Sequence, residues 1–142
     1  MQIAIRRLSP NTPLPEYKTA GAVAFDLAVL EGKTLEPNER FLFSTGLVIN
    51  VPNDHMLMLA PRSSNAKKGI RLSNGIGIID SDYCGPNDEL KLSLHNIGTA
   101  PYTVEAGERI AQGFFLPISR AVFYEPETWE TLQDRGGFGT TG

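Results

Sequence analysis

Residues 90–95 read Leu-Lys-Leu-Ser-Leu-His, with an apolar side chain at every second position, and this stretch decides the fold class. Side chains of a β-strand point alternately to its two faces, so a period of two predicts a strand with one face in the core and the other toward solvent. The spacing of three to four residues that marks an amphipathic helix hardly occurs in the chain. The sequence therefore predicts an all-β protein.

Ten further stretches have the composition of short strands. They are residues 2–7, 24–29, 40–43, 46–50, 55–60, 70–72, 75–79, 102–104, 109–115 and 121–124. Turn-forming residues separate them, and Gly and Pro fill 14 and 10 of the 142 positions, more than an average domain carries. Many short strands with frequent turns predict a β-sandwich or barrel.

Composition limits the partners. A chain of 142 residues is long enough for one domain with its own core. The net charge of −3 argues against a nucleic acid polymer as partner, because such sites are basic, but a few local cations can still bind a small anion. Cys84 is the single cysteine, and no stretch reaches the ~18 apolar residues of a membrane span or the apolar core of a signal peptide. We therefore expect a cytoplasmic protein without a membrane or nucleic acid partner.

Two segments combine glycine with chemically active side chains. Residues 63–68 predict one helical turn, with Ser63 or Ser64 as N-cap and Gly69 at its end. Arg62 precedes this turn, which is either an anion site or an ordinary surface feature, and Lys67-Lys68 is expected to be a solvated pair.

The second segment, residues 74–85, has glycines at 75 and 77 and acids at 80 and 82. It is either a bulged edge strand with a turn or a place where a ligand approaches the backbone. Residues 134–142 are rich in glycine and are either a frayed tail or a mobile flap with Arg135 and Phe138 as contacts.

Five segments together resemble a known family in their order along the chain. They are residues 22–27 (Ala-Val-Ala-Phe-Asp-Leu), 61–64 (Pro-Arg-Ser-Ser), 77–85 (Gly-Ile-Ile-Asp-Ser-Asp-Tyr-Cys-Gly), 107–112 (Gly-Glu-Arg-Ile-Ala-Gln) and 135–142 (Arg-Gly-Gly-Phe-Gly-Thr-Thr-Gly). This order resembles the five motifs of the homotrimeric dUTP pyrophosphatases, or dUTPases. The resemblance implies a distorted jelly-roll or sandwich-like β-barrel with one short helix, a body over residues 1–132, a flexible lid over 133–142, and a homotrimer with shared active sites.

The resemblance also implies an activity, the hydrolysis of dUTP to dUMP and pyrophosphate, which lowers dUTP and supplies dUMP for thymidylate synthesis. Asp80 would be the catalytic base for a water that attacks the α-phosphorus. The implied nucleoside contacts are Asn74, Gly77, Ile78, Ile79, Tyr83 and Lys91. The implied phosphate contacts are Arg62, Ser63, Ser64 and Gln112, and the lid contacts are Arg135, Phe138, Gly139 and Thr140.

Mg²⁺ is the implied cofactor, held by the substrate phosphates with Asp26 near its water shell. Two other functions stay open. A dCTP deaminase, or its bifunctional form, shares the fold, with Glu89 as a conceivable stand-in for the glutamate that activates the deaminating water in that family. A non-catalytic regulator with this fold is the other, and its best support is a fifth motif with two residues fewer than usual between Arg135 and Phe138.

Overall fold

The computed structural model describes residues 1–128 and 136–137, and within them it is a β structure with one short helix. The elements are β1 (Ile5–Arg7), β2 (Phe25–Ala28), β3 (Lys33–Leu35), β4 (Arg40–Ser44), β5 (Leu47–Ile49), β6 (His55–Pro61), η1 (Ser63–Lys68), β7 (Ile70–Leu72), β8 (Gly77–Ile79), β9 (Lys91–Asn96), β10 (Tyr102–Val104) and β11 (Arg109–Pro117). The prediction of an all-β jelly-roll type of fold is confirmed.

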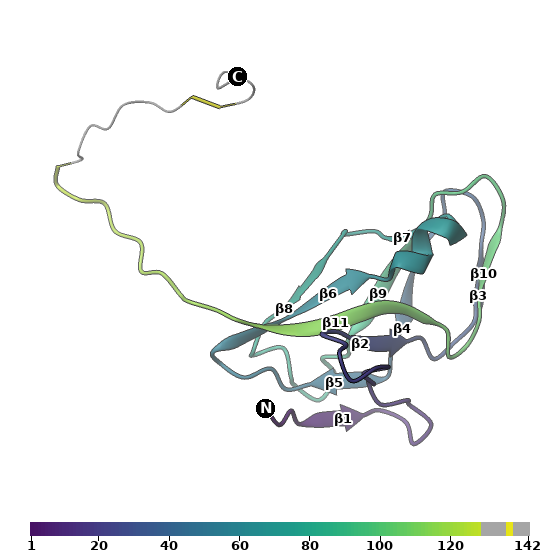
Figure 1. Cartoon of the computed structure of the whole chain (residues 1–142), viewed down its shortest axis with the longest axis horizontal. Coiled ribbons are helices and arrows are strands. Elements are labelled where there is room, and N and C mark those ends of the chain that lie inside the picture. Colours follow the sequence, from purple (N-terminus) through teal and green to yellow (C-terminus); the bar gives the residue numbers. More distant parts are fainter. Residues whose placement is uncertain (129–135, 138–142) are drawn as a thin grey trace.

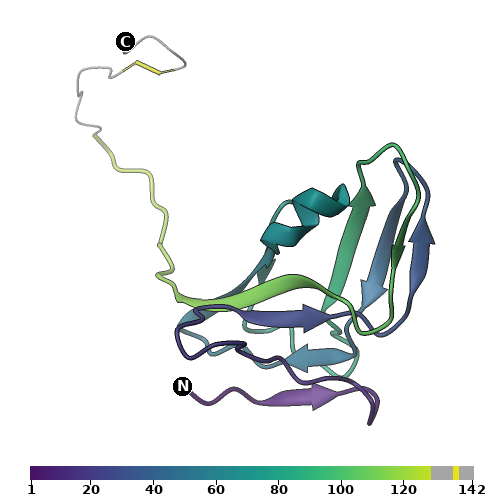
Figure 2. The ribbon, with the colours of Figure 1, turned by 45° about the vertical axis from the view of Figure 1, so that its right-hand side comes forward.

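Antiparallel pairing joins these strands into small sheets (Figure 1). The largest has the order β2-β11-β6-β8, and a three-stranded sheet has the order β4-β9-β7. Two pairs, β1-β5 and β3-β10, complete the body. In Figure 2 the strands of the two larger sheets cross steeply, and η1 follows the end of β6. The sheet order places β8 at an edge and β11 in the interior of its sheet.

The core confirms the alternation that predicted the fold. Leu90, Leu92 and Leu94 are buried, whereas Lys91 is exposed. His95 departs from the pattern, because it is buried on the other face of β9. Its Nε2 lies 2.9 Å from Asn38 Oδ1, so a hydrogen bond replaces the water that this polar ring would otherwise keep.

Most predicted strands exist, and their differences from the prediction have local causes. The strands over residues 70–72 and 102–104 are confirmed at the predicted bounds. β3 was not predicted, because Lys-Thr-Leu contains a single apolar residue and so shows no alternation. The strand predicted over residues 2–7 is shorter, and the one predicted over 75–79 begins only at Gly77, since Gly75 is in a turn with φ of +72°.

The strand predicted over residues 121–124 is wrong. In the described part of the chain no segment pairs with it, and Val122, Phe123 and Tyr124 are 90%, 94% and 82% exposed. Both views show the chain running away from the body after β11 (Figures 1 and 2). Residues 118–128 are called the arm below.

The helical turn at residues 63–68 is confirmed as a 3₁₀ helix, and its predicted end is confirmed too. Gly69 has φ of +68°, and its N–H donates to Ala66 O at 3.3 Å. The predicted serine cap is wrong, because Arg62 is the N-cap and its side chain makes no capping hydrogen bond. Among the described residues no helix has the length and apolar character to cross a membrane.

Candidate active site

An acidic side chain, Asp26, fixes two arginines at one end of the four-stranded sheet. Its Oδ1 is 2.9 Å from Arg62 Nε and its Oδ2 is 3.0 Å from Arg109 Nη1. The Asp26 side chain is only 13% exposed. Charged hydrogen bonds at this depth are stronger than at an open surface, so this carboxylate holds both guanidinium groups in place. Both of its oxygens are thereby engaged by arginines.

A bulge in β11 explains how the start of η1 is attached beside this ion pair. Between Arg109 and Ala111 the register against β2 shifts, which leaves Ile110 without an opposite residue. Arg62 Nη1 donates to Arg109 O at 2.9 Å, and Asn65 Nδ2 donates to Ile110 O at 2.8 Å. Two consecutive carbonyls of the bulge therefore position the segment that carries Arg62 and the two serines.

Gln112 completes this end of the sheet. In the register it lies opposite Asp26 on β2 and Ala60 on β6, and its Nε2 donates to Pro61 O at 3.1 Å. The expected grouping of Asp26, Arg62 and Gln112 is therefore present. We call these three residues and Arg109 the arginine cluster, and its two positive charges exceed its one negative charge. Ser63 and Ser64 begin η1 next to it, with the Ser64 hydroxyl buried and without a partner among the described residues.

The far end of η1 shows that one expectation about its lysines was wrong. Lys68 is not freely solvated, because its side chain is only 29% exposed and its ammonium pairs with Glu108 and lies 5.9 Å from the centre of the Tyr102 ring. The hydrogen bond with Glu108 raises the pKa of Lys68. Lys68 therefore fastens η1 to the segment before β11, and only Lys67 stays exposed.

The glycine-rich hairpin arm forms an edge of the sheet. β8 pairs with β6 on one side, Gly77 opposite Leu59 and Ile79 opposite Leu57, and within the described residues its other edge is unpaired. A Cβ at Gly77 would lie 3.2 Å from the Leu59 Cβ. A side chain at position 77 would therefore crowd Leu59, while Ile78 points outward and is 56% exposed. Asn74, in the turn before β8, is exposed as well.

Asp80 follows β8 directly and opens a tight turn. Its C=O accepts from Tyr83 N at 3.3 Å, and its side chain is exposed. The Tyr83 ring is 41% exposed and fixed at its far end, since its hydroxyl donates to Glu89 O at 3.1 Å. Residues 86–88 close a small turn of their own, with Gly85 N donating to Asp88 Oδ2 at 2.7 Å, and Asp80 is not part of it.

Glu89 supports the neighbouring strands. Its Oε1 accepts from Gly46 N at 2.7 Å, its Oε2 accepts from Ser44 Oγ at 3.3 Å, and Lys91 Nζ lies 3.8 Å from the same carboxylate. The side chain is 13% exposed. Lys91 is therefore placed by Glu89 next to the hairpin, and we call Asn74, Ile78, Asp80, Tyr83 and Lys91 the hairpin cluster.

Asp80 and Arg62 lie toward opposite ends of β6. Because β8 runs antiparallel to β6, Ile79 is level with Leu57, and Asp80 comes after it, away from Pro61. Leu57 and Pro61 are four positions apart, which is about 13 Å of strand. One chain therefore does not bring Asp80 and Arg62 together.

Some residues were missed or stay untested. Arg109 and Asn65 were not predicted as site residues. Arg109 is part of the fourth motif, three positions before Gln112. Its positive charge and the negative charge of Asp26 in the first motif were the available signal that the two could pair. Asn65 had no such signal. The expected lid contacts Arg135, Phe138, Gly139 and Thr140 lie outside the described residues, and so does the expected lid as a whole apart from residues 136–137.

Comparison with known proteins gives a consistent result. A family model described as dUTPase matches residues 10–142. The deoxyuridine 5′-triphosphate nucleotidohydrolase of Methylocella silvestris is 45% identical, with 100% of this chain and 92% of the relative covered. That of Wolinella succinogenes is 42% identical, with 100% and 95% covered. The crystal structure of dUTPase from Streptococcus mutans is 32% identical, covers 87% of this chain and 100% of its own, and has a TM-score of 0.76.

Proposed function

Because this chain belongs to the dUTPase family and is a dUTP diphosphatase, which hydrolyses dUTP to dUMP and pyrophosphate, we propose that Asp80 is its catalytic base. The observation that carries this proposal is the position of Asp80, which is exposed at the end of the edge strand β8. Within the described residues the outer edge of this strand is unpaired, so it can face the uracil ring of the substrate. Its carboxylate accepts a proton from the attacking water while the new O–P bond forms at the α-phosphorus. The bond from that phosphorus to the bridging oxygen breaks, and pyrophosphate leaves. The dUMP formed then serves thymidylate synthesis.

The hairpin cluster is the proposed nucleoside pocket. The unpaired edge of β8, with the backbone of Gly77, Ile78 and Ile79, offers donors and acceptors to uracil, and Asn74 and Lys91 flank this edge. Against cytosine these polar groups would stay unpaired, and such a mismatch can lower kcat/KM for dCTP relative to dUTP by about 10⁴-fold. The release of pyrophosphate from dUTP, dCTP, dTTP and UTP tests the assignment, and equal rates on all four would refute it.

Tyr83 is proposed to pack under the deoxyribose and to leave no room for a 2′-hydroxyl. We expect Tyr83→Ala to reduce the preference for dUTP over UTP about tenfold, because the space below the sugar opens. The kcat/KM values for the two substrates measure this preference. Tyr83→Phe is the matched control, since it keeps the ring and loses only the hydrogen bond to Glu89. An unchanged preference in Tyr83→Ala would contradict the role.

The arginine cluster is the proposed phosphate site, with Arg62, Ser63, Ser64 and Gln112 as contacts. Its excess of positive charge suits a triphosphate in a protein with net charge −3. Mg²⁺ is the proposed cofactor. No group of three or more acidic, His or Cys side chains gathers within the described residues, which fits an ion carried by phosphate oxygens. When bound it neutralises phosphate charge, and Arg62 and Gln112 then bind and orient the chain of phosphates.

Asp26 has two candidate roles, and one variant separates them. Because both of its oxygens hold arginines, we expect Asp26→Asn to raise the KM for dUTP about tenfold through a displaced Arg62. Titration of Mg²⁺ at saturating dUTP is the deciding measurement. If excess Mg²⁺ restores full activity, Asp26 acts on the metal's water shell instead. Circular dichroism controls for the fold.

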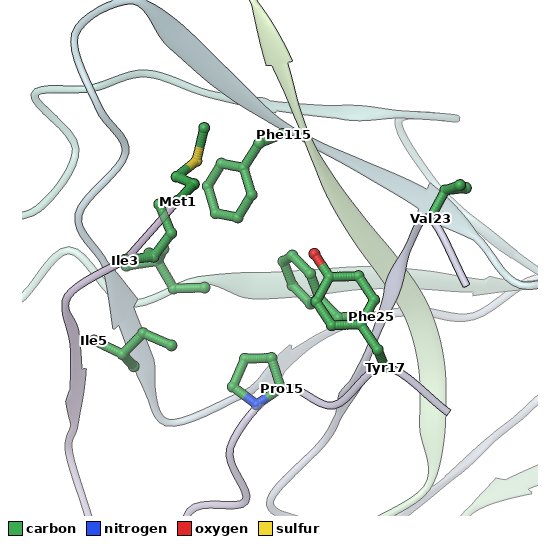
Figure 3. Close-up of a pocket in the computed structure, with 9 residues that line it drawn as sticks. Met1, Ile3, Ile5, Pro15, Tyr17, Val23, Phe25 and Phe115 are labelled. Carbon is green, nitrogen blue, oxygen red and sulfur yellow. The ribbon is translucent and has the colours of Figure 1, made fainter. Parts of the chain in front are cut away.

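A homotrimer with shared active sites is the proposed assembly. The separation of Asp80 from Arg62 along β6 supports it, since another subunit can bring a second copy of either residue to the site. A second support is the arm, whose apolar side chains at residues 122–124 are covered by nothing in the described part of their own chain. The body has an apolar groove of about 420 Å³ between its N-terminus and β2, in which Ile3, Tyr17 and Phe115 face one another (Figure 3). We propose that the arm of a neighbouring subunit covers this groove.

The remaining residues are assigned as a lid. Residues 133–142 would close over a site formed by other subunits, with Phe138 on uracil, Arg135 on the terminal phosphate, and Gly139 and Thr140 on the triphosphate. The glycine content of this segment suits a backbone that must reshape around a ligand.

Deamination of dCTP is not favoured. Glu89, the conceivable acid for it, already binds Gly46 N and Ser44 Oγ and is mostly buried. Ammonia release from dCTP is the test, and we expect none. A non-catalytic regulator is not favoured either, because the relatives are named as nucleotidohydrolases.

A further inference from the structure

The arm is fastened to the body at its first residues. β11 ends at Pro117, opposite His55 of β6. Ile118 N then donates to Asp54 O at 2.9 Å, and Arg120 Nη1 donates to Asn53 O at 2.7 Å. The start of the arm is thus held against the turn between β5 and β6.

Arg120 has a second contact on a different turn. Its Nη2 lies 3.3 Å from Ser81 Oγ, and Ser81 is the residue directly after Asp80. A guanidinium group presents its donors in a rigid planar fork, so one arginine can hold two acceptors in a fixed relation. Arg120 therefore links the turn that carries Asp80 to the turn between β5 and β6.

The turn that carries Asp80 has few other ties among the described residues. Within the turn, Tyr83 N donates to Asp80 O at 3.3 Å, which is long for such a bond, and Cys84 Sγ, a weak donor, reaches Ser81 O at 3.6 Å. The Tyr83 hydroxyl fixes only the far side of the turn. Among the described residues, Arg120 supplies the side-chain contact that reaches Ser81, next to the proposed base, from another part of the fold.

We propose that Arg120 is a positioning residue for dUTP hydrolysis, which holds Asp80 in place through the Ser81 hydroxyl. The inference rests on the proposed role of Asp80. If the base shifts relative to the attacking water, kcat falls even when the substrate still binds, because proton transfer requires hydrogen-bond distance. Arg120 is exposed and distant from the core, so its loss leaves the fold intact.

The test compares Arg120→Ala, Ser81→Ala and the double variant. We expect each single variant to lower kcat about fivefold with KM for dUTP within about twofold, and the double variant to be no slower than the singles. Arg7→Ala is the control, because Arg7 is an exposed arginine whose side chain donates to Pro10 O, in a different part of the fold from the Asp80 turn. Its kcat should equal that of the unmodified protein.

Three outcomes would overturn the inference. They are an unchanged kcat in Arg120→Ala, additive losses in the double variant, or a loss of kcat that accompanies a loss of the oligomer in sedimentation. Asp80→Asn is measured in parallel. If Asp80→Asn is fully active, the proposed role of Asp80 fails. If Asp80→Asn is inactive and Arg120→Ala has normal kcat, the inference about Arg120 fails alone.

Discussion

Asp80→Asn is expected to lower kcat for dUTP about 10³-fold while dUTP still binds, since an amide cannot take the proton of the attacking water. The side chain keeps its size and lies exposed after β8, so neither the turn nor the sheet should change. Pyrophosphate release measures kcat, and calorimetric titration with a non-hydrolysable dUTP analogue measures binding.

The neighbouring acid provides a matched control for this result. Asp82 lies in the same turn and is also exposed, but it does not follow the edge strand directly. Asp82→Asn changes the net charge equally and should keep kcat within about threefold. Should both variants lose activity alike, the general charge of the turn would be responsible, and Asp80 would not be the base.

Mixed trimers of two inactive variants are expected to recover activity. The variant Asp80→Asn lacks the proposed base of the hairpin cluster, and the variant Arg62→Ala lacks a proposed phosphate contact of the arginine cluster. If different subunits supply the two clusters of each site, any trimer that contains both variants has one intact site, so about one third of normal activity returns. Co-expression with two affinity tags and sequential purification isolates the mixed trimers for assay.

The outcome for a site within one chain is different and equally clear. Each site would then contain one of the two lesions, and mixed trimers would be as inactive as the single variants. Trimers with two tags on unmodified chains show that the tags do no harm. Residual activity at the level of the single variants would thus remove the support that the distance along β6 gives to shared sites.

Local patterns predicted the strands well and their ends less well. Alternation at residues 90–95 was enough because each apolar side chain enters the core. The alternation placed His95 on the solvent face, whereas it is buried. Its burial depends on a hydrogen bond with Asn38, which lies 57 residues earlier in the chain. The arm was misread because its composition suits a strand, whereas a strand also needs a neighbour, and no local pattern reports one.

The site was predicted by motif rather than by geometry. The motifs gave Asp26, Arg62 and Gln112, and the structure places them together. The motifs did not predict that Asp26 pairs with two arginines. They also did not predict that the carbonyl of Ile110, at a bulge, accepts a hydrogen bond from Asn65. Such contacts join residues far apart in the chain, and they depend on strand register, which a short motif does not encode.

The place of β11 has a consequence for how the protein is made. β11 is the last strand in the described sequence, yet it lies between β2 and β6 in the interior of the largest sheet. While a ribosome synthesises the chain, β2 and β6 therefore wait without their common partner until residue 117 has emerged. The body cannot complete its folding in stages from the N-terminus, and nascent chains that stop before β11 expose two open strand edges, which makes them prone to aggregation.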